Sequence, residues 1–326
     1  MKKRTIFLIA LLAVLLAAAL SLTLGASGIG FGSLLSAVGD PGSTAGRIFY
    51  LVRLPRTLGS LLSGAALAVA GCVIQGVLAN PLASPSIIGV NAGAGLAVTI
   101  CCAFGAVSGW VIAGASFFGA LAAVALVVFL AEQCGASRTT VILGGVAVNS
   151  FLNGLRDAVT NLAPSTGVMS SDFRVGGFAS VSTVRLVPAG VLIGVALILV
   201  FTLHNELDVM TLGEDTARGL GMNVKATRSL LLALAALLAG ASVSFAGLLG
   251  FVGLIVPHAV RHFAGNESRV LLPLSALFGA AFVTFADLIA RLAFAPYELP
   301  VGICMSVLGG PFFLGLLYKR KGGRSE

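Results

Sequence analysis

The sequence predicts an all-α, polytopic membrane protein, and three observations support this fold class. Of the 326 residues, 58% are hydrophobic and only 10% are charged, with a mean hydropathy of +1.06; soluble domains average about 25% charged residues. No Asp, Glu, Lys, Arg or His occurs from Thr57 to Ala131, a stretch that can hold three spans of about 20 residues each. The basic residues lie between apolar segments and at both ends of the chain. This composition excludes a soluble enzyme, a disordered chain, a coiled coil and a secreted disulfide scaffold.

Ten apolar segments follow one another along the chain, and their flanking residues set the limits of each. The first segment follows Lys2, Lys3 and Arg4 and is longer than the apolar part of a signal peptide, so we expect a retained helix. Two prolines within 80–85 end the second segment, because proline cannot continue a helix. The expected spans are 5–24, 57–79, 87–106, 109–131, 139–161, 186–204, 229–248, a short one at 250–263, 270–290 and 299–318.

Two stretches are too irregular to face lipid. Residues 247–258 are short and glycine-rich, and residues 80–85 contain two prolines. Irregular backbone at membrane depth is tolerated only where protein or a cavity surrounds it, so we expect both stretches to be covered by protein. Residues 68–76 also resemble residues 237–245, on spans that run in opposite directions. This match suggests two half-related sets of spans, as in an inverted repeat, although a bias toward Gly and Ala would produce the same match.

The distribution of Lys and Arg predicts the orientation in the membrane. With the N-terminus in the cytoplasm and alternating spans, thirteen of the 20 basic residues face the cytoplasm, as the positive-inside rule requires. Both termini then lie in the cytoplasm. Seven basic residues fall outside, at positions 47, 53, 56, 156, 174, 185 and 291. The basic residues form no patch for nucleic acid, and we expect no nucleic-acid partner.

The longest cytoplasmic connection, residues 205–228, is predicted to contain a short exposed helix. Thr211 and Glu214 have the spacing of a capping box, and Glu214 can pair with Arg218 one turn later. Gly219 or Gly221 would end the helix. A rigid helix at the membrane surface suits the docking of a cytoplasmic partner; the alternative is a solvated linker.

Three arginines expected at the outer ends of spans are the second unusual feature. Arg53 and Arg56 precede the second span, and Arg291 follows the ninth. Guanidinium groups bind carboxylates in a planar, bidentate geometry, so these residues could receive an acidic partner protein. The alternative is anchoring to lipid headgroups.

No set of residues in the sequence predicts catalysis or metal binding. There is no P-loop motif, and the five cysteines lack the spacing of metal ligands. His258 and His262 fit the polar end of a helix better than a ligand pair, and Asp287 is expected to pair locally with Arg291. Asn149 and Asn153 share one face of the fifth span, which suits either helix packing or the wall of a polar pathway.

Short motifs recur along nearly the whole chain in an order typical of one protein family. They are Arg53–Arg56, Gly64–Gly71 with Gln75, Asn80–Ala83 with Pro85 and Gly89, Gly213–Gly221, Gly250–His258, and Glu298–Gly302 with Gly309–Pro311. On these motifs the chain resembles the FecCD-type permeases, the membrane subunits of ABC importers for iron-siderophores, haem and cobalamin.

The resemblance implies a single transmembrane domain, residues 1–326, similar to the cobalamin-importer permease. Such a subunit lies in the bacterial cytoplasmic membrane and pairs with a second permease subunit, an identical copy or a paralogue. Two cytoplasmic ABC ATPases, which bind ATP and Mg, drive it, and an extracytoplasmic binding protein delivers the substrate. The resemblance implies no cofactor, metal site or enzymatic site on this chain itself.

The family's functional residues fall on positions that match its motifs. ATPase coupling is expected at Gly213, Glu214, Asp215, Ala217, Arg218, Leu220 and Gly221. Docking of the binding protein is expected at Arg53, Arg56 and Arg291. The gate and pathway are expected at Ser137, Arg138, Thr139, Thr140, Asn149 and Asn153.

One outer loop departs from the family pattern. Many relatives carry tryptophans and a Gly-Ser pair before the sixth span, whereas this chain has Phe173–Gly177 there. We therefore expect an iron chelate, with an iron-siderophore favoured over haem and cobalamin, and assign no single compound. The alternatives are an ion-coupled secondary transporter, which needs acids within the membrane, and a membrane-embedded enzyme, which needs paired catalytic groups.

Overall fold

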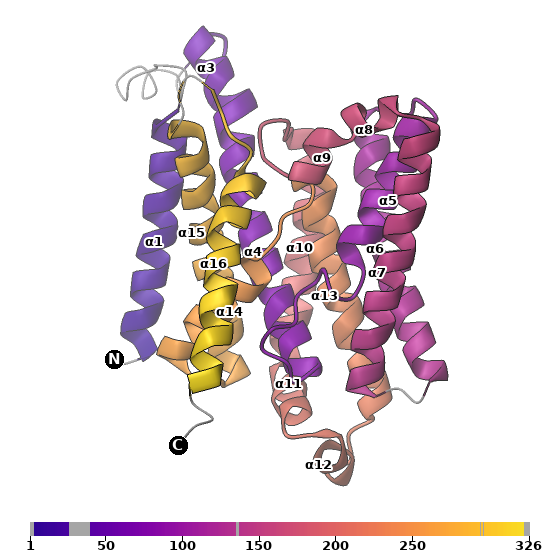
Figure 1. Ribbon diagram of the computed structural model, residues 1–326. Coiled ribbons are helices and arrows are strands. Elements are labelled where there is room, and N and C mark those ends of the chain that lie inside the picture. The colour runs from indigo at the N-terminus through magenta and orange to yellow at the C-terminus, as the bar shows by residue number, and fades with distance from the viewer. Residues whose placement is uncertain (1–2, 26–39, 135–136, 294, 296, 323–326) are drawn as a thin grey trace.

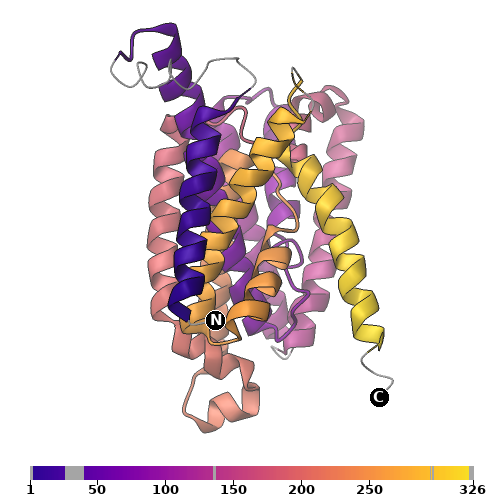
Figure 2. The ribbon, with the colours of Figure 1, turned by 90° about the vertical axis from the view of Figure 1, so that its left-hand side faces the viewer.

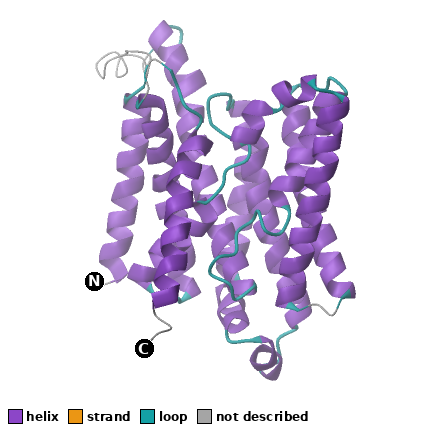
Figure 3. Ribbon diagram, viewed as in Figure 1, coloured by secondary structure: helices purple, strands orange, loops and turns teal. Residues whose placement is uncertain are grey.

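The computed structural model of the chain describes residues 3–25, 40–134, 137–293, 295 and 297–322, and these residues form a helical bundle without strands (Figures 1 and 3). The helices are α1 Lys3–Thr23, α3 Thr44–Ile48, the π-helix η1 Phe49–Arg53, α4 Leu54–Val77, α5 Val90–Ala103, α6 Gly109–Gln133, α7 Arg138–Leu162, α8 Ser165–Met169, α9 Ser171–Val175, α10 Thr183–Thr202, α11 His204–Thr211, α12 Glu214–Gly219, α13 Val224–Ala246, α14 Val252–Ala264, α15 Ser268–Leu292 and α16 Val301–Gly322.

Each of the ten expected segments coincides with one helix: α1, α4, α5, α6, α7, α10, α13, α14, α15 and α16. Within the described residues, six helices are long and apolar enough to cross a membrane by length and composition. These are α1, the continuous helix 44–77 that ends in α4, α6, α10, α13 and α15. Helices α5 and α14 are shorter, with 14 and 13 residues. Among the basic residues used to predict the orientation, Lys2 and Arg324 lie outside the described residues.

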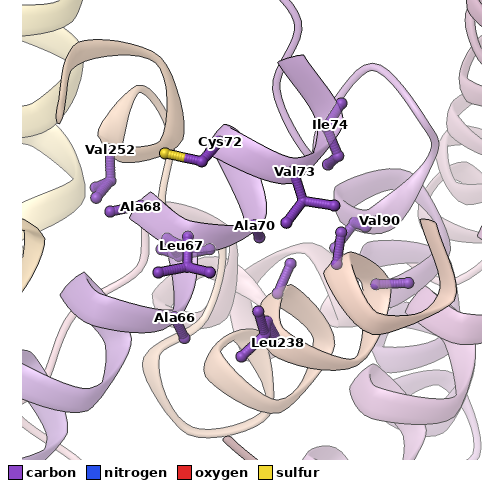
Figure 4. Packing of buried hydrophobic residues seen from close by; sticks show 14 of the residues in the cluster. Ala66, Leu67, Ala68, Ala70, Cys72, Val73, Ile74, Val90, Leu238 and Val252 are labelled. Atoms are coloured by element: carbon purple, nitrogen blue, oxygen red, sulfur yellow. The ribbon is translucent and has the colours of Figure 1, made fainter. Parts of the chain in front are cut away.

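Helices α4 and α13 form the centre of the bundle. In each, 78% of the most apolar stretch is buried, against 22% in α1 and 28% in α6 and α10. Figure 4 shows the centre: Ala66, Ala68 and Ala70 of α4 lie among Leu238 of α13 and Val252 of α14. Small side chains on α4 let several helices approach it at once, which is how helices in lipid gain packing without a hydrophobic driving force.

Helix α4 meets two neighbours at glycine contacts. A Cβ atom added at Gly64 would lie 2.1 Å from the carbonyl oxygen of Gly279 in α15, and one at Gly279 would lie 2.3 Å from the oxygen of Gly64. A Cβ atom at Gly71 would lie 2.0 Å from the oxygen of Gly253 in α14. These positions exclude any side chain, because the opposing atoms belong to the backbone and cannot rotate away.

Two irregular segments interrupt the helices, at 78–89 and 247–251. Each leads into a short helix through a residue with a left-handed backbone, Gly89 with φ of 96° before α5 and Phe251 with φ of 65° before α14. In the second segment, Gly247 and Leu249 are buried. The first contains Ala83 and Ile88, both with no exposed surface. The expectation that protein covers these stretches is therefore confirmed.

The two halves of the chain repeat one order of elements. A central helix, an irregular segment, a short helix and a long helix occur as α4, 78–89, α5 and α6, and again as α13, 247–251, α14 and α15. Helix α4 packs on α14 and α15, whereas α13 packs on α5 and α6, so each central helix contacts the matching pair of the other half. The arrangement agrees with the half-related sets expected from the sequence.

Replacing Gly279 by Ala should destabilise the protein by about 1–3 kcal/mol, the usual cost of overpacking a filled interior. The added methyl would meet the oxygen of Gly64. The measurement is thermal unfolding of the purified protein in detergent. Gly194→Ala in α10 is the matched control, because a Cβ atom there meets nothing within 4 Å. Equal unfolding midpoints for the two variants would contradict the prediction.

Candidate functional site

A buried charge cluster lies at the end of the bundle where α1 ends and α4 begins. Arg56 donates through Nε and Nη2 to the two oxygens of Asp287, at 2.9 and 3.0 Å, and through Nη1 to Glu298 at 2.6 Å. Arg291 also approaches Asp287, with its Nε 3.7 Å from Oδ2, the oxygen that the Nε of Arg56 binds. Asp287 has no exposed surface. Burying a carboxylate of this kind is tolerated because two guanidinium groups compensate its charge.

The same cluster holds the end of α1. Arg53 donates to the carbonyl oxygens of Leu22 and Thr23, at 2.9 and 2.8 Å. Arg291 donates to the carbonyl oxygen and the hydroxyl of Ser21, at 3.0 and 2.8 Å. The last carbonyls of a helix lack partners within it and carry partial negative charge. Two cations therefore satisfy them and fasten α1 to the bundle.

Arg53, Arg56 and Arg291, which were expected to be available to an acidic partner protein or to lipid headgroups, are buried in the chain. Their exposed fractions are 3%, 6% and 2%, and their donors are used inside the chain. The sequence pattern gave no sign of this, because Asp287 pairs with Arg56 across 231 positions as well as with Arg291 one turn away. Docking would require these arginines to exchange internal partners for external ones.

Glu298 is the member of the cluster that reaches the surface, with 36% of its side chain exposed. It lines a cavity of about 160 Å³ together with Arg56, Asp172 and the residues of segments 176–180 and 299–301. Glu298 belongs to one of the family motifs, but nothing in the sequence indicates a role for it. Glu298 lies on an irregular connection, 242 positions from its partner Arg56, so no local pattern in the sequence predicts their pairing.

At the opposite end of the bundle, α12 projects beyond the other helices (Figures 1 and 2). Asp215, Arg218 and Leu220 are exposed, whereas Ala217 is buried against the bundle. The expected pair of Glu214 and Arg218 is present at 3.3 Å, and Glu214 also accepts from Arg228 at the start of α13. The prediction of a short, exposed helix is confirmed, and the alternative of a plain linker is wrong.

The predicted capping box is wrong. Thr211 closes the preceding helix α11, where its hydroxyl donates to the carbonyl oxygen of Asp208 at 2.7 Å. Helix α12 begins after Gly213, which has a φ of 111° and no capping side chain. Gly221, with a φ of 83°, turns the chain after the helix. The 205–228 loop therefore contains most of one helix, α11, and a second complete helix, α12.

The start of α7 contains the predicted gate residues. Ser137 caps the helix: its hydroxyl accepts from the backbone N–H of Thr140 at 3.1 Å and lies 2.7 Å from the Thr140 hydroxyl. Arg138 donates to the carbonyl oxygen of Met210 in α11. Ser137 and Thr139 are exposed, whereas Arg138 and Thr140 are half-buried.

Asn149 and Asn153 of α7 have different surroundings. Asn149 donates through Nδ2 to the carbonyl oxygens of Ser86 and Ile87, at 2.9 and 3.0 Å. It thereby satisfies backbone groups of the irregular segment before α5. Asn153 is half-buried beside the exposed Ser150 and Gly154. A face of α7 with Leu143, Val146 and Phe151 is also exposed in this single chain.

The two histidines that could form a ligand pair each lie against an aromatic ring. His258 lies edge-to-face with Phe312, with ring centroids 5.8 Å apart, and His262 does the same with Phe263 at 5.3 Å. Among the residues that the structure describes, no group of three His, Cys, Asp or Glu residues could hold a metal ion. Between α14 and α15, Glu267 accepts from Lys3, and this hydrogen bond lowers the pKa of Glu267 below its usual value.

Comparison with known proteins gives matches along almost the whole chain. The model of the FecCD transport family matches residues 11–319. The Fe(3+)-citrate import system permease protein YfmD of Bacillus subtilis (strain 168) is 40% identical over 322 residues, which covers 96% of this chain and 94% of YfmD. The iron(3+)-hydroxamate import system permease protein FhuB of the same organism is 38% identical over 319 residues, covering 94% of this chain and 81% of FhuB.

A solved structure is also similar. It is an inward-facing conformation of a metal-chelate type ABC transporter, with a TM-score of 0.85 and 28% sequence identity. The match covers 97% of this chain and 99% of that chain. The fold of the present chain is thus one already seen in a solved ABC transporter.

Replacing Asp287 by Ala should destabilise the protein by about 3–5 kcal/mol, because it leaves the buried guanidinium of Arg291 without its carboxylate and that of Arg56 with Glu298 alone. The unfolding midpoint in detergent measures the effect. Asp157→Ala is the control: Asp157 pairs with Arg156 but is 64% exposed, so its loss should cost about 0–1 kcal/mol. An unfolding midpoint of Asp287→Ala as high as that of the control would refute the structural role of the cluster.

Proposed function

Because this chain belongs to the FecCD transport family, we propose that it is the channel-forming permease subunit of an ABC importer for an iron chelate. The substrate would move into the cytoplasm by alternating access, driven by a separate ATPase. The observation that carries the proposal is the near full-length similarity to the permeases named for ferric citrate and ferric hydroxamate. An iron-siderophore is the favoured substrate, followed by haem and cobalamin.

The proposal includes ten membrane crossings and cytoplasmic termini. The start of α1, the end of α16 and α12 lie at one end of the bundle (Figure 1), and the basic residues of both termini favour the cytoplasmic side there. The short helices α5 and α14 complete crossings together with the irregular segments before them. Because those segments are buried, their lack of regular structure is compatible with membrane depth.

Partners are proposed for three exposed surfaces. A second permease subunit, identical or paralogous, would cover the exposed face of α7 and enclose a pathway between the two copies. Two ABC ATPases, which hold ATP and Mg, would dock on the coupling segment Gly213–Gly221, where Leu220 has 65% of its surface exposed. An extracytoplasmic binding protein would dock at the opposite end, near the charge cluster and the cavity that Glu298 lines.

The gate is proposed at the cytoplasmic start of α7, at Ser137, Arg138, Thr139 and Thr140. Asn153 would line the pathway with its exposed neighbours, whereas Asn149 would fix α7 to the irregular segment 78–89. The hydrogen bonds of Asn149 to Ser86 and Ile87 support this division of roles.

The alternative, an ion-coupled secondary transporter, has less support. Such transporters use acids within the membrane as ion sites. Asp287 is a buried acid of the bundle, but both of its oxygens are bound by Arg56. A carboxylate held in this way is poorly placed to bind and release an ion in each cycle.

Uptake by the reconstituted transporter tests the function. In proteoliposomes with the ATPase and the binding protein, ferric citrate or a ferric hydroxamate should accumulate only when ATP is supplied. Cobalamin and haem serve as competing substrates in the same assay. Accumulation without ATP that disappears when a proton gradient is collapsed would instead support the secondary transporter.

Water access to α7 tests the pathway. In a variant without the five native cysteines, Asn153→Cys should react with a membrane-impermeant thiol reagent, and bound substrate should slow the reaction. Val195→Cys is the control, because Val195 lies on the exposed apolar face of α10 and is expected to face lipid. Equal labelling of the two positions would argue against a pathway along α7.

A further inference from the structure

The end of α6 and the start of α7 form polar contacts with the two helices that flank α12 in the chain. Helix α11 precedes α12 in the chain, and α13 follows it. The first turn of α7 is hydrogen-bonded to α11, and the last turn of α6 forms a salt bridge and a hydrogen bond with α13. The predicted roles of the region, gating at α7 and coupling at α12, do not include this pair of attachments.

The first attachment is made by Arg138, in the first turn of α7. Its guanidinium donates to the carbonyl oxygen of Met210, in the last turn of α11, where helix carbonyls lack partners within the helix. Met210 itself has no exposed surface. Helix α7 packs along α5 and α6, and Arg138 extends from that layer to the segment that leads into α12.

Helix α11 is in turn fixed to the centre of the bundle. The side chain of Leu207 lies against Gly76 of α4, where an added Cβ atom would come within 2.6 Å of it. A carboxylate oxygen of Asp208 accepts from the backbone N–H of Ser268 at 3.0 Å, at the start of α15. A movement of α11 would therefore displace its contacts with α4 and α15 and, through Arg138, its contact with α7.

The second attachment is made by Glu132, in the last turn of α6. Its two oxygens accept from Lys225 at 3.2 Å and from the hydroxyl of Ser229 at 3.1 Å, both in the first two turns of α13. In the same turns, Arg228 donates to Glu214 of α12. The polar contacts thus run from α12 to α13 and from α13 to α6.

We propose that Arg138 and Glu132 are positioning residues that transmit a displacement of α12 to the cytoplasmic ends of α7 and α6 during the transport cycle. The inference rests on the proposed function. Hydrogen bonds to charged groups are stronger than those between neutral groups, so they can couple the movement of one helix end to that of another.

The test measures substrate uptake and ATP hydrolysis in the same proteoliposomes, containing the complete transporter. Arg138→Ala and Glu132→Ala should retain ATP hydrolysis but lower the substrate transported per ATP by about fivefold or more, the lower range of coupling between linked sites. Arg138→Lys should recover part of this loss, because lysine keeps a charged donor. The charge exchange Glu132→Lys with Lys225→Glu should restore transport relative to Glu132→Lys alone.

The control is Lys3→Ala, which removes the ion pair of Lys3 with Glu267, an exposed contact that does not involve α12. It should leave the substrate transported per ATP unchanged. Wild-type transport per ATP in Arg138→Ala, or an equal loss in Lys3→Ala, would overturn the inference. If Arg138→Ala does not assemble, a lack of recovery in the charge exchange overturns it. Failure of the wild-type protein to use ATP would refute the proposed function instead.

Discussion

In the apolar part of a membrane, every backbone N–H and C=O group must find its partner within the protein, and this requirement organises the chain. Its two central helices end in irregular segments inside the bundle, where no helix satisfies the backbone. Asn149 supplies donors to the first segment, and the carbonyl oxygen of Phe173 accepts from Leu248 in the second. Glycines at helix contacts such as Gly64 and Gly279 let neighbouring helices approach closely.

The few charges of the chain follow the same logic. Seven basic residues depart from the positive-inside rule, but three of them are buried and form hydrogen bonds within the protein. Arg53 and Arg291 satisfy the last carbonyls of α1, and Arg56 compensates Asp287. A buried guanidinium with partners inside the protein is part of the packing. It is therefore a poor indicator of the orientation of the chain in the membrane. The burial of a charged side chain distinguishes the charges that hold helices together from those that are available at the surface.

The sequence allowed the helices to be predicted well, since apolar length and helix-breaking residues are local properties. It also allowed α12 to be predicted, because Glu214 and Arg218 are one turn apart. It did not allow the cluster around Asp287 to be predicted, because Arg56 and Glu298 come from distant parts of the chain. Thr211 was misassigned because a capping spacing looks the same whether the residue starts one helix or ends another. The roles of Asn149 and Arg138 depend on backbone carbonyls, which carry no signature in a sequence.

The fastening of α1 has a consequence for how the protein is made. Ser21 emerges from the ribosome early, whereas its partner Arg291 lies 270 positions further along the chain. Until α15 has been synthesised, this end of α1 has the donors of Arg53 but lacks those of Arg291. The complete set of hydrogen bonds at the end of α1 therefore forms only when α15 is in place. A chain that stops before α15 would hold this end of α1 without the two hydrogen bonds that Arg291 donates to Ser21.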